Sequence, residues 1–481
     1  MTSLKNKAIN GIKWTALSSI INAILQLLQL MILARYLSAA DFGIIAILMV
    51  IVGFSQVFVD FGLSKAIIYK KKITSKQLDT LYWLNIILAF LIFTLIYFLS
   101  EYIANFYNQE ILSKYIILIS LSIIIQAFGQ QFRTLFQKEL KFDILAKIDI
   151  IAAFISFISA IVLALNNYGV YSLIYPVLVI TSIKSVLLLF YGLKVHKIGF
   201  SFNLNEVKEF LSFGSYTVGN GIVSTIATKI DIIIIGKLLG TETLGLYSII
   251  KELILKPAEL INPVIIKVAF PTMSKVNDDI IAVKRIYLKL INYVASINFP
   301  IYFVSALLAP EIITIFLGEK WLNGVFIFQI LAFWAMIRSI GNPVGSLVMA
   351  LGKPQYEMYW NIFMMFLMPI VVYISSFWKI EGIAWGNLTS IIFLFIPAWY
   401  FLVKRLCGAT LQEYTMSITY PFVISFLIAS IIYIILYVLD GNLIHRFSVV
   451  IIFGIPLLWI LNKKYNQNFY NMLLSILKKS S

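Results

Sequence analysis

Residues 81–100 read LYWLNIILAFLIFTLIYFLS, without a charged side chain among them. About 20 apolar residues in a helix span the roughly 30 Å hydrocarbon core of a bilayer. The run is continuous rather than alternating, which favours a helix over a strand of a closed barrel. Similar runs recur along the 481-residue chain, of which 61% is hydrophobic and 12% charged. The sequence therefore predicts a polytopic, all-α membrane protein without a soluble domain of any size.

The hydropathy pattern predicts fourteen transmembrane helices, two of which are weakly marked. Segment 244–270 is polar and rich in proline, and segment 447–462 is short. The first segment follows lysines and has no small-residue cleavage site, so it is expected to be an uncleaved anchor. The predicted spans are 12–34, 42–64, 81–101, 114–131, 144–165, 170–193, 213–236, 244–270, 288–309, 325–350, 356–377, 381–403, 415–439 and 447–462.

The distribution of positive charge predicts the orientation. With a cytoplasmic N-terminus, 25 of the 38 Lys and Arg residues fall in cytoplasmic segments and six in external loops. This bias follows the positive-inside rule and predicts that both termini are cytoplasmic. The net charge of +16 is then explained by topology and by anionic membrane lipids, so no nucleic acid is expected as a partner.

Cysteine and histidine are too sparse for a disulfide or a metal site. Cys407 is the only cysteine, so the chain cannot form an intrachain disulfide. His196 and His445 are far apart in sequence, in loops predicted on opposite sides of the membrane. Neither a metal nor a cofactor is therefore expected.

The chain resembles itself at an offset of about 202 residues. ARYL at 34–37 corresponds to GKLL at 236–239, and FGI at 42–44 corresponds to LGL at 244–246. An offset of six spans places both copies in the same orientation, as in a parallel repeat. The predicted domains are a six-helix bundle at 1–195, a cytoplasmic interfacial linker at 196–212, a six-helix bundle at 213–406, and two appended helices with a cytoplasmic tail at 407–481.

Polar residues gather on single faces of the first two predicted helices of each half. Because a polar group in lipid is costly, these faces predict a shared water-filled cavity. In segment 244–270, Lys256 is also spaced to pair with Glu252 and Glu259, and such pairs would only neutralise each other. The same segment contains Pro257 and Pro263, and Pro271 directly follows it. These prolines permit either a kinked helix that acts as a gate or static packing.

Eight short motifs in order along residues 1–405 are typical of one family. They are LARYL at 33–37 with DFG at 41–43, DFGLS at 60–64, LYWLN at 81–85, GQQFR at 129–133 with QKEL at 137–140, GEKW at 318–321, and RSIGNP at 338–343. With these motifs the chain resembles the polysaccharide-transport branch of the multidrug/oligosaccharidyl-lipid/polysaccharide exporter superfamily. Within that branch it is most similar to Wzx-type flippases of the colanic-acid exporter kind.

The resemblance implies two pseudo-symmetric six-helix bundles in a MATE-like V. It also implies that the protein is not an enzyme, and that it moves polyprenyl-pyrophosphate-linked oligosaccharide repeat units across a bacterial inner membrane for O-antigen, capsule or exopolysaccharide synthesis. Transport would proceed by alternating access, coupled to H⁺ or Na⁺. The polysaccharide polymerase and chain-length machinery are candidate partners.

The polar residues supply three kinds of candidate ligand for such a substrate. A pyrophosphate needs cations, a sugar chain needs amides or hydroxyls, and a coupling ion needs a carboxylate in a site of low dielectric constant. The candidate cations are Arg35, Lys65, Lys251, Lys256, Lys267 and Arg338; the amides are Asn22, Gln26 and Gln29; and the carboxylates are Asp60, Asp231, Glu252 and Glu259.

Other functions of a polytopic membrane protein are open from the sequence. A flippase for lipid II or a teichoic-type precursor would use the same chemistry. A multidrug cation antiporter would want a mostly apolar and acidic cavity, whereas this one is rich in cations. A membrane-embedded glycosyltransferase or polymerase would want a large loop, and the longest loops here are about 20 residues.

Overall fold

The computed structural model describes residues 2–60, 62–70, 73–438 and 443–480, and within these ranges it contains helices and no strand. The chain divides into two compact units. Unit 1 comprises Met1–Ile249 with Asn361–Ile370, and unit 2 comprises Ile250–Trp360 with Val371–Ser481. The boundary between the units lies inside a helical segment rather than in the linker 196–212, so the two predicted halves stay a prediction.

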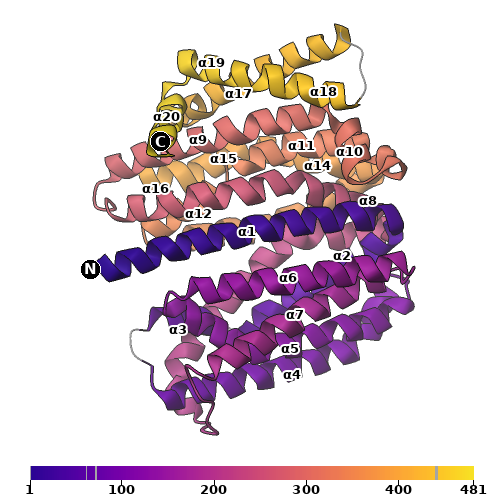
Figure 1. Ribbon diagram of the computed structural model, residues 1–481, viewed down its shortest axis with the longest axis vertical. Helices are drawn as coiled ribbons and strands as arrows, with labels where there is room; N and C mark the ends of the chain where they lie inside the picture. Colours follow the sequence, from indigo (N-terminus) through magenta and orange to yellow (C-terminus); the bar gives the residue numbers. More distant parts are fainter. Residues whose placement is uncertain (1, 61, 71–72, 439–442, 481) are drawn as a thin grey trace. The chain divides into compact units, whose positions relative to one another are not determined.

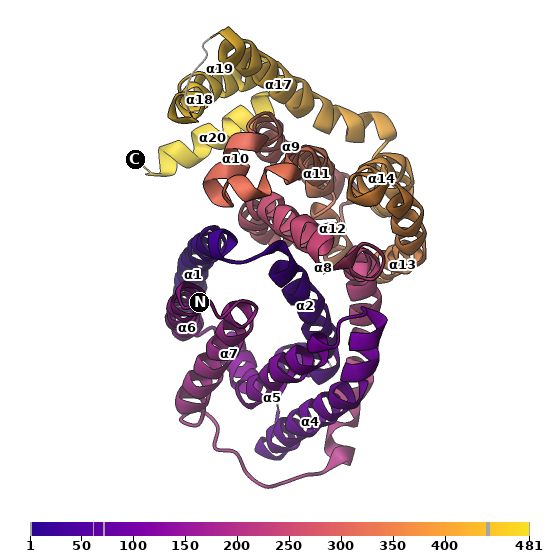
Figure 2. The ribbon, with the colours of Figure 1, turned by 90° about the vertical axis from the view of Figure 1, so that its right-hand side faces the viewer.

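Unit 1 is built from long helices that lie side by side. Helix α1 contacts α6, α6 contacts α7, α7 contacts α5, and α5 contacts α4 and α2 (Figures 1 and 2). The elements are α1 (Thr2–Tyr36), α2 (Ala39–Asp60), α3 (Leu63–Tyr69), α4 (Ser75–Phe106), α5 (Ile111–Lys138), α6 (Phe142–Leu165), α7 (Tyr171–Gly192), the short 3₁₀ helix η1 (Leu204–Val207) and the first part of α8 (Lys208–Ser274).

Unit 2 is arranged around α9, which contacts both α11 and α17. Its core packs Tyr287 and Ile291 of α9 against Leu347, Trp399 and Val403. The elements are the last part of α8, α9 (Ile280–Leu307), α10 (Ala309–Phe316), η2 (Glu319–Gly324), α11 (Val325–Ser339), α12 (Pro343–Ala350), α13 (Gln355–Ser375) apart from Asn361–Ile370, η3 (Ser376–Trp378), α14 (Lys379–Phe393), α15 (Phe395–Ala398), η4 (Trp399–Lys404), α16 (Arg405–Cys407), α17 (Leu411–Val438), α18 (Leu443–Val449), η5 (Val450–Gly454), α19 (Ile455–Tyr465) and α20 (Gln467–Ser480).

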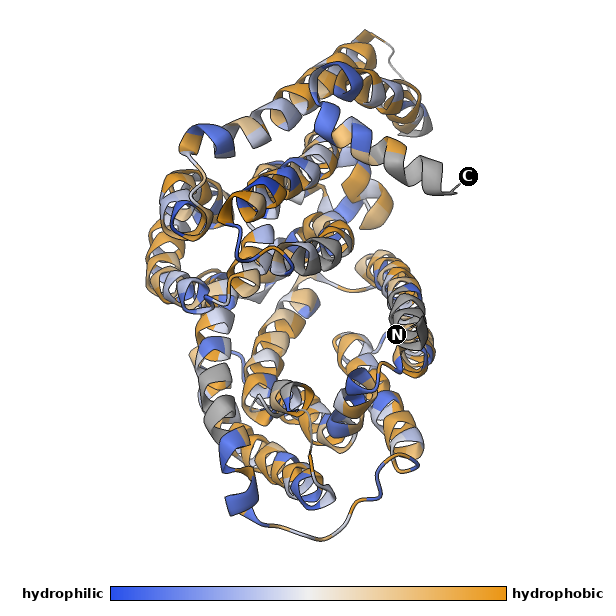
Figure 3. Ribbon diagram, turned by 90° about the vertical axis from the view of Figure 1, so that its left-hand side faces the viewer, coloured by the Kyte–Doolittle hydropathy of each residue, from blue (hydrophilic) through white to orange (hydrophobic). Residues whose placement is uncertain are grey.

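The outward faces of the helices are apolar, as lipid requires. Eleven stretches of the described helices are long and apolar enough to cross a membrane. In α4, large side chains such as Leu91 and Phe98 are exposed, and hydrophobic residues cover most of each long helix (Figure 3). Leaving such surface in water would cost about 25 cal/mol per Å². The chain is therefore a multi-pass, all-α membrane protein, as predicted.

The difference between eleven stretches and fourteen predicted spans has two sources. Helix α8 contains the predicted spans 213–236 and 244–270 and is not among the eleven. The stretch Gln355–Phe393 contains the predicted span 356–377 and most of 381–403. The number of fourteen membrane crossings accordingly stays a prediction.

Helix α8 reverses direction at Gly240, which has a φ of 82°. The Tyr247 hydroxyl donates a hydrogen bond of 2.8 Å to the Asp231 carboxylate. Sixteen residues of straight helix would separate these two positions by about 24 Å, so the chain must turn back between them. The prolines of segment 244–270 lie in helical backbone, and the break falls on glycine because only glycine reaches a positive φ without steric cost.

Helix α2 and the part of α8 that follows Gly240 approach each other at glycines. A Cβ on Gly43 of α2 would overlap the carbonyl oxygen of Thr241, and a Cβ on Gly245 would overlap the carbonyl oxygen of Ala39. Both contacts lie within unit 1. In a membrane protein, close backbone approach of this kind replaces the hydrophobic effect as a source of helix association.

The linker 196–212 packs on the first turns of α4 through specific polar contacts. The Asp79 carboxylate accepts a 2.9 Å hydrogen bond from the Gly199 amide and lies 3.0 Å from the His196 ring. The Trp83 indole donates to the Gly199 carbonyl at 2.9 Å. Among the apolar residues of the linker, Val207 is buried in the protein, whereas Phe200 is exposed.

Candidate functional site

In unit 2, two predicted cationic ligands share one aromatic ring. The Lys251 ammonium lies 5.5 Å from the centre of the Trp334 ring, and the Arg338 guanidinium lies 5.2 Å from it. Lys251 belongs to α8, whereas Trp334 and Arg338 are one turn apart on α11. Both distances allow a cation–π interaction, which holds the cations in place without neutralising them. We call Lys251, Arg338 and Trp334 the cation cluster.

Lys256 forms the intrahelical pairs that its spacing allows. Its ammonium is 3.3 Å from the Glu252 carboxylate and 3.5 Å from the Glu259 carboxylate. The Lys256 side chain is 10% exposed, whereas those of Glu252 and Glu259 are 53% and 58% exposed. The carboxylates therefore remain accessible while they balance a buried cation.

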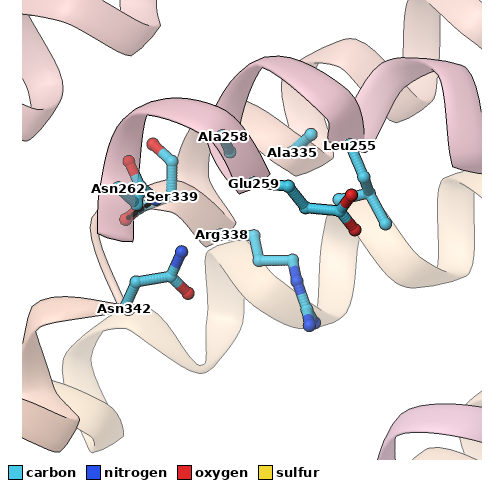
Figure 4. A pocket seen from close by; sticks show the side chains of 8 residues that line it. All are labelled: Leu255, Ala258, Glu259, Asn262, Ala335, Arg338, Ser339 and Asn342. Carbon is cyan, nitrogen blue, oxygen red and sulfur yellow. Dashed lines mark hydrogen bonds between the residues drawn. The ribbon is translucent and has the colours of Figure 1, made fainter. Parts of the chain in front are cut away.

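A cavity of about 300 Å³ opens beside these residues. Figure 4 shows Glu259 of α8 and Arg338 of α11 among the side chains that line it, together with Asn262 and Asn342. The cavity thus combines a guanidinium, a carboxylate and two amides. This set can bind an anion and, beside it, groups that donate or accept hydrogen bonds.

Asn262, which lines the cavity, belongs to a buried amide pair. The Asn298 amide donates a 2.9 Å hydrogen bond to the Asn262 carbonyl oxygen, and the Asn262 amide is 3.5 Å from the Ser339 carbonyl. Among the described residues, the Asn298 side-chain oxygen is buried without a hydrogen-bond partner. Reasoning from helix faces missed Asn298 of α9.

In unit 1, Asp60 belongs to a series of polar contacts that we call the polar ladder. It joins residues spaced by four on α2 and α3 to residues spaced by four on α5. The distances between side-chain atoms are 3.2 Å for Gln56–Gln126, 3.4 Å for Asp60–Gln130, 3.2 Å for Ser64–Gln130 and 3.0 Å for Ser64–Thr134. The Ser64 hydroxyl also donates to Asp60. The ladder places a half-buried carboxylate among amide and hydroxyl groups that can bind a small cation or a proton.

The α5 side of this ladder was missed by sequence reasoning. Gln130 entered only through a family motif, and the spacing of Gln126, Gln130 and Thr134 was the signal that could have revealed a polar face. The α2 side was predicted, because Gln56, Asp60 and Ser64 share one helical face.

Six of the remaining predicted ligands belong to unit 1, namely Asn22, Gln26, Gln29, Arg35, Lys65 and Asp231, whereas Lys267 belongs to unit 2. On α1, Asn22 donates to Ser18 at 3.2 Å, Gln26 is exposed, Gln29 is half-buried, and Arg35 is exposed near the helix end. Asp231 is buried and accepts the Tyr247 hydroxyl. The side chains of Lys65 and Lys267 lie outside the described residues.

A charged triad within unit 1 was not predicted as a unit. Asp149 of α6 lies 2.9 Å from Arg133 of α5 and 3.2 Å from Lys184 of α7. Its side chain is largely buried, and two parallel hydrogen bonds of 3.0 and 2.9 Å join it to the guanidinium. Sequence reasoning found these charges singly and could not see that three helices bring them together.

The fold is similar to those of two solved membrane transporters. A lipid II flippase MurJ in an inward closed conformation aligns with a TM-score of 0.75 at 16% identity, covering 96% of this chain and 100% of that one. An inward-facing multidrug resistance MATE transporter aligns with a TM-score of 0.54 at 15% identity, covering 83% and 94%. These similarities show a shared all-α membrane fold, which is the class predicted.

The chain belongs to the polysaccharide biosynthesis protein family, which it matches over residues 32–326. It is 30% identical to the lipopolysaccharide biosynthesis protein WzxC of Escherichia coli (strain K12), over 92% of this chain and 90% of that protein. It is 34% identical to an uncharacterized membrane protein in the cps region of Klebsiella pneumoniae (88% and 87% covered) and 29% identical to the teichuronic acid biosynthesis protein TuaB of Bacillus subtilis (strain 168) (88% of each). The predicted resemblance to Wzx-type proteins is confirmed.

Proposed function

We propose that this protein is a flippase that moves polyprenyl-pyrophosphate-linked oligosaccharide repeat units across a bacterial inner membrane for polysaccharide synthesis. The observation that carries the proposal is the cation cluster, in which Lys251 and Arg338 flank one buried tryptophan beside a polar cavity. Family membership and relatives named for lipopolysaccharide and teichuronic acid synthesis support it.

The pyrophosphate explains why cations are kept inside a membrane helix. A pyrophosphate carries at least two negative charges and loses water when it enters the membrane, so it needs charged partners there. Trp334 positions both Lys251 and Arg338 without supplying a counter-charge. Asn262 and Asn342 at the same cavity supply hydrogen-bonding groups for a sugar hydroxyl.

The polar ladder is the proposed coupling site for H⁺ or Na⁺. Asp60 is a half-buried carboxylate with amide and hydroxyl neighbours on α3 and α5. Binding a cation at Asp60 would neutralise the negative charge of its carboxylate inside unit 1. It would thereby change the free-energy cost of burying the helix face that carries Asp60. Coupling to a cation gradient by alternating access then follows as a mechanism.

The proposed topology has fourteen crossings, two six-helix halves at 1–195 and 213–406, and cytoplasmic termini. The reversal of the chain at Gly240 supports separate seventh and eighth spans. The reciprocal contacts of Gly43 and Gly245 support a repeat. The bias in Lys and Arg supports the orientation. The protein would be a transporter rather than an enzyme, working beside the polymerase and chain-length machinery.

A flippase for a teichuronic or related wall-polymer precursor is the second candidate. The observation that favours it is the relative named for teichuronic acid biosynthesis, which matches 88% of this chain. The same cationic cavity would serve any prenyl-pyrophosphate carrier. A multidrug cation antiporter fits less well, because cationic drugs would be repelled by Lys251 and Arg338.

Reconstitution into proteoliposomes tests the proposal. Labelled lipid-linked oligosaccharide is placed in one leaflet, and its arrival in the other leaflet is followed with an external glycosidase or quencher. Wild-type protein should translocate the label, and Arg338→Gln and Lys251→Gln should reduce the rate at least tenfold. Lys320→Gln is the matched control, because Lys320 lies 5.6 Å from the Trp321 ring but does not line the cavity. Folded wild-type protein that moves none of several donors would overturn the proposal.

A further inference from the structure

A second polar pocket of about 550 Å³ lies in unit 2, away from the cation cluster. It opens between the first turns of α9, the first turns of α17, and the junction of α19 with α20. The residues on which the argument depends are Arg285, Lys289, Asn292, Ser417, Lys464 and Asn466.

The pocket is strongly cationic. Arg285 and Lys289 are four apart on α9 and so lie on one face, while Lys464 comes from the last turn of α19. None of the described residues that line the pocket is acidic. The neighbouring carboxylate, Glu413, lies 2.9 Å from the ammonium of Lys284, which does not line the pocket. Three positive charges therefore face one small volume and favour an anion there.

A buried acceptor in the pocket also lacks a partner. Asn292 is 5% exposed, and its amide donates a 3.1 Å hydrogen bond to the Ser417 carbonyl. Its side-chain oxygen has no hydrogen-bond partner among the described residues. Leaving a buried acceptor unpaired is unfavourable, so a ligand that carries a hydroxyl would gain by donating to this oxygen.

The start of α20 adds oriented donors to the pocket. Gln467 and Asn468, the first two residues of this 14-residue helix, line the pocket, and unpaired amides at a helix N-terminus favour an anion. The junction is held in place because the Asn466 amide donates a 2.8 Å hydrogen bond to Ser296 of α9. The pocket is thus preformed by three separate segments.

We propose that this pocket binds the phosphate and a hydroxyl of an anionic membrane lipid of the phosphatidylglycerol class. The three cations face the phosphate, and the Asn292 oxygen accepts a hydrogen bond from the glycerol headgroup. Helices α9 and α17 both belong to stretches able to cross a membrane, and the pocket lies in their first turns, at the depth where headgroups lie. The site is separate from the cavity proposed for the transported substrate.

Native mass spectrometry of the detergent-purified chain tests this lipid site. Bound lipid is counted at equal concentrations of phosphatidylglycerol and phosphatidylcholine, with soluble glycerol 1-phosphate as a competitor. Wild-type protein should retain phosphatidylglycerol preferentially. Lys464→Gln should weaken that binding about fivefold, and the triple variant R285Q/K289Q/K464Q on the order of a hundredfold, at about 1 kcal/mol for each charge. Lys463→Gln, its neighbour outside the pocket, should bind as the wild type does.

Three results would overturn the lipid site. One is equal retention of phosphatidylcholine by the wild type. Another is unchanged binding by the triple variant, with its thermal unfolding midpoint confirming that it is folded. The third is displacement of the lipid by millimolar glycerol 1-phosphate, which would assign the pocket to a soluble phosphate instead. Because none of these readouts involves translocation, a failed flippase assay would leave this result unaffected.

Discussion

Gly43 and Gly245 make reciprocal contacts. Gly43 lies against the backbone carbonyl of the residue four positions before Gly245, and Gly245 lies against the carbonyl of the residue four positions before Gly43. Gly43 faces the Thr241 carbonyl, and Gly245 faces that of Ala39. The two glycines are 202 residues apart, and so are Ala39 and Thr241, which carry the two carbonyls; 202 residues is the offset of the internal repeat. Such a reciprocal contact is what a two-fold relationship between two copies of a segment produces. The repeat is thus expressed in the packing of α2 against α8.

Alanine at either glycine should separate α2 from α8. The new methyl group would overlap a backbone carbonyl, and overpacking of this kind typically costs about 1–3 kcal/mol. We expect Gly43→Ala and Gly245→Ala to lower the thermal unfolding midpoint in detergent. Gly53→Ala is the control on the same helix, because nothing lies within 4 Å of its added Cβ. A Gly43→Ala protein as stable as Gly53→Ala would refute the close contact.

Trp334 should act on transport through the two cations that it positions. Each cation–π interaction contributes about 0.5–2 kcal/mol, so Trp334→Leu should raise the substrate concentration needed for half-maximal transport several-fold. Trp334→Phe keeps an aromatic face and should restore most of the affinity. The exposed Trp378→Leu serves as control. Equal affinities for the Leu and Phe variants would show that the ring only fills space.

Neutralising Asp60 should uncouple transport from the cation gradient. Asp60→Asn keeps an oxygen that can accept from Gln130 and Ser64 but removes the charge. Uphill transport driven by a pH or sodium gradient should fall at least tenfold, while exchange without a gradient persists. Gln126→Ala, which alters another rung of the ladder, should keep its gradient dependence. Full gradient-driven transport by Asp60→Asn would exclude Asp60 as the coupling site.

Removing Asp149 should destabilise unit 1. Asp149→Ala leaves Arg133 and Lys184 without their shared carboxylate, and breaking a buried pair in this way typically costs a few kcal/mol. Glu139→Gln provides the comparison, since its pair with Lys141 is exposed on both sides and should cost under about 1 kcal/mol. Unfolding midpoints in detergent measure both. If the two variants lost equal stability, the triad around Asp149 would stabilise unit 1 no more than an exposed ion pair does.

Much of the local organisation could be predicted from residue spacing. The long apolar runs specified helices, because backbone groups in lipid must be satisfied within the segment. The i+3 and i+4 spacing of Glu252, Lys256 and Glu259 predicted ion pairs that the structure contains. The polar face of Gln56, Asp60 and Ser64 was also visible. Each of these features depends only on residues within about one or two helical turns.

The partners of those faces could not be predicted. Nothing in the spacing of α2 indicated that Gln126, Gln130 and Thr134 of α5 would face it. The triad around Asp149 likewise required three helices to meet, and Trp334 was not recognised as the shared neighbour of Lys251 and Arg338. In α8 the prolines suggested a kink, whereas the chain reverses at Gly240.

By itself, then, the sequence determined an all-α membrane protein of the polysaccharide exporter family and the faces on which its polar residues lie. The periodicity of a helix is a local property, so it is written in residues close together in the chain. Only the tertiary structure decided which face meets which, because helices in lipid choose partners by close packing and by satisfying polar groups across long sequence separations. The cation cluster, the polar ladder and the Gly43–Gly245 contact all depend on this packing between helices.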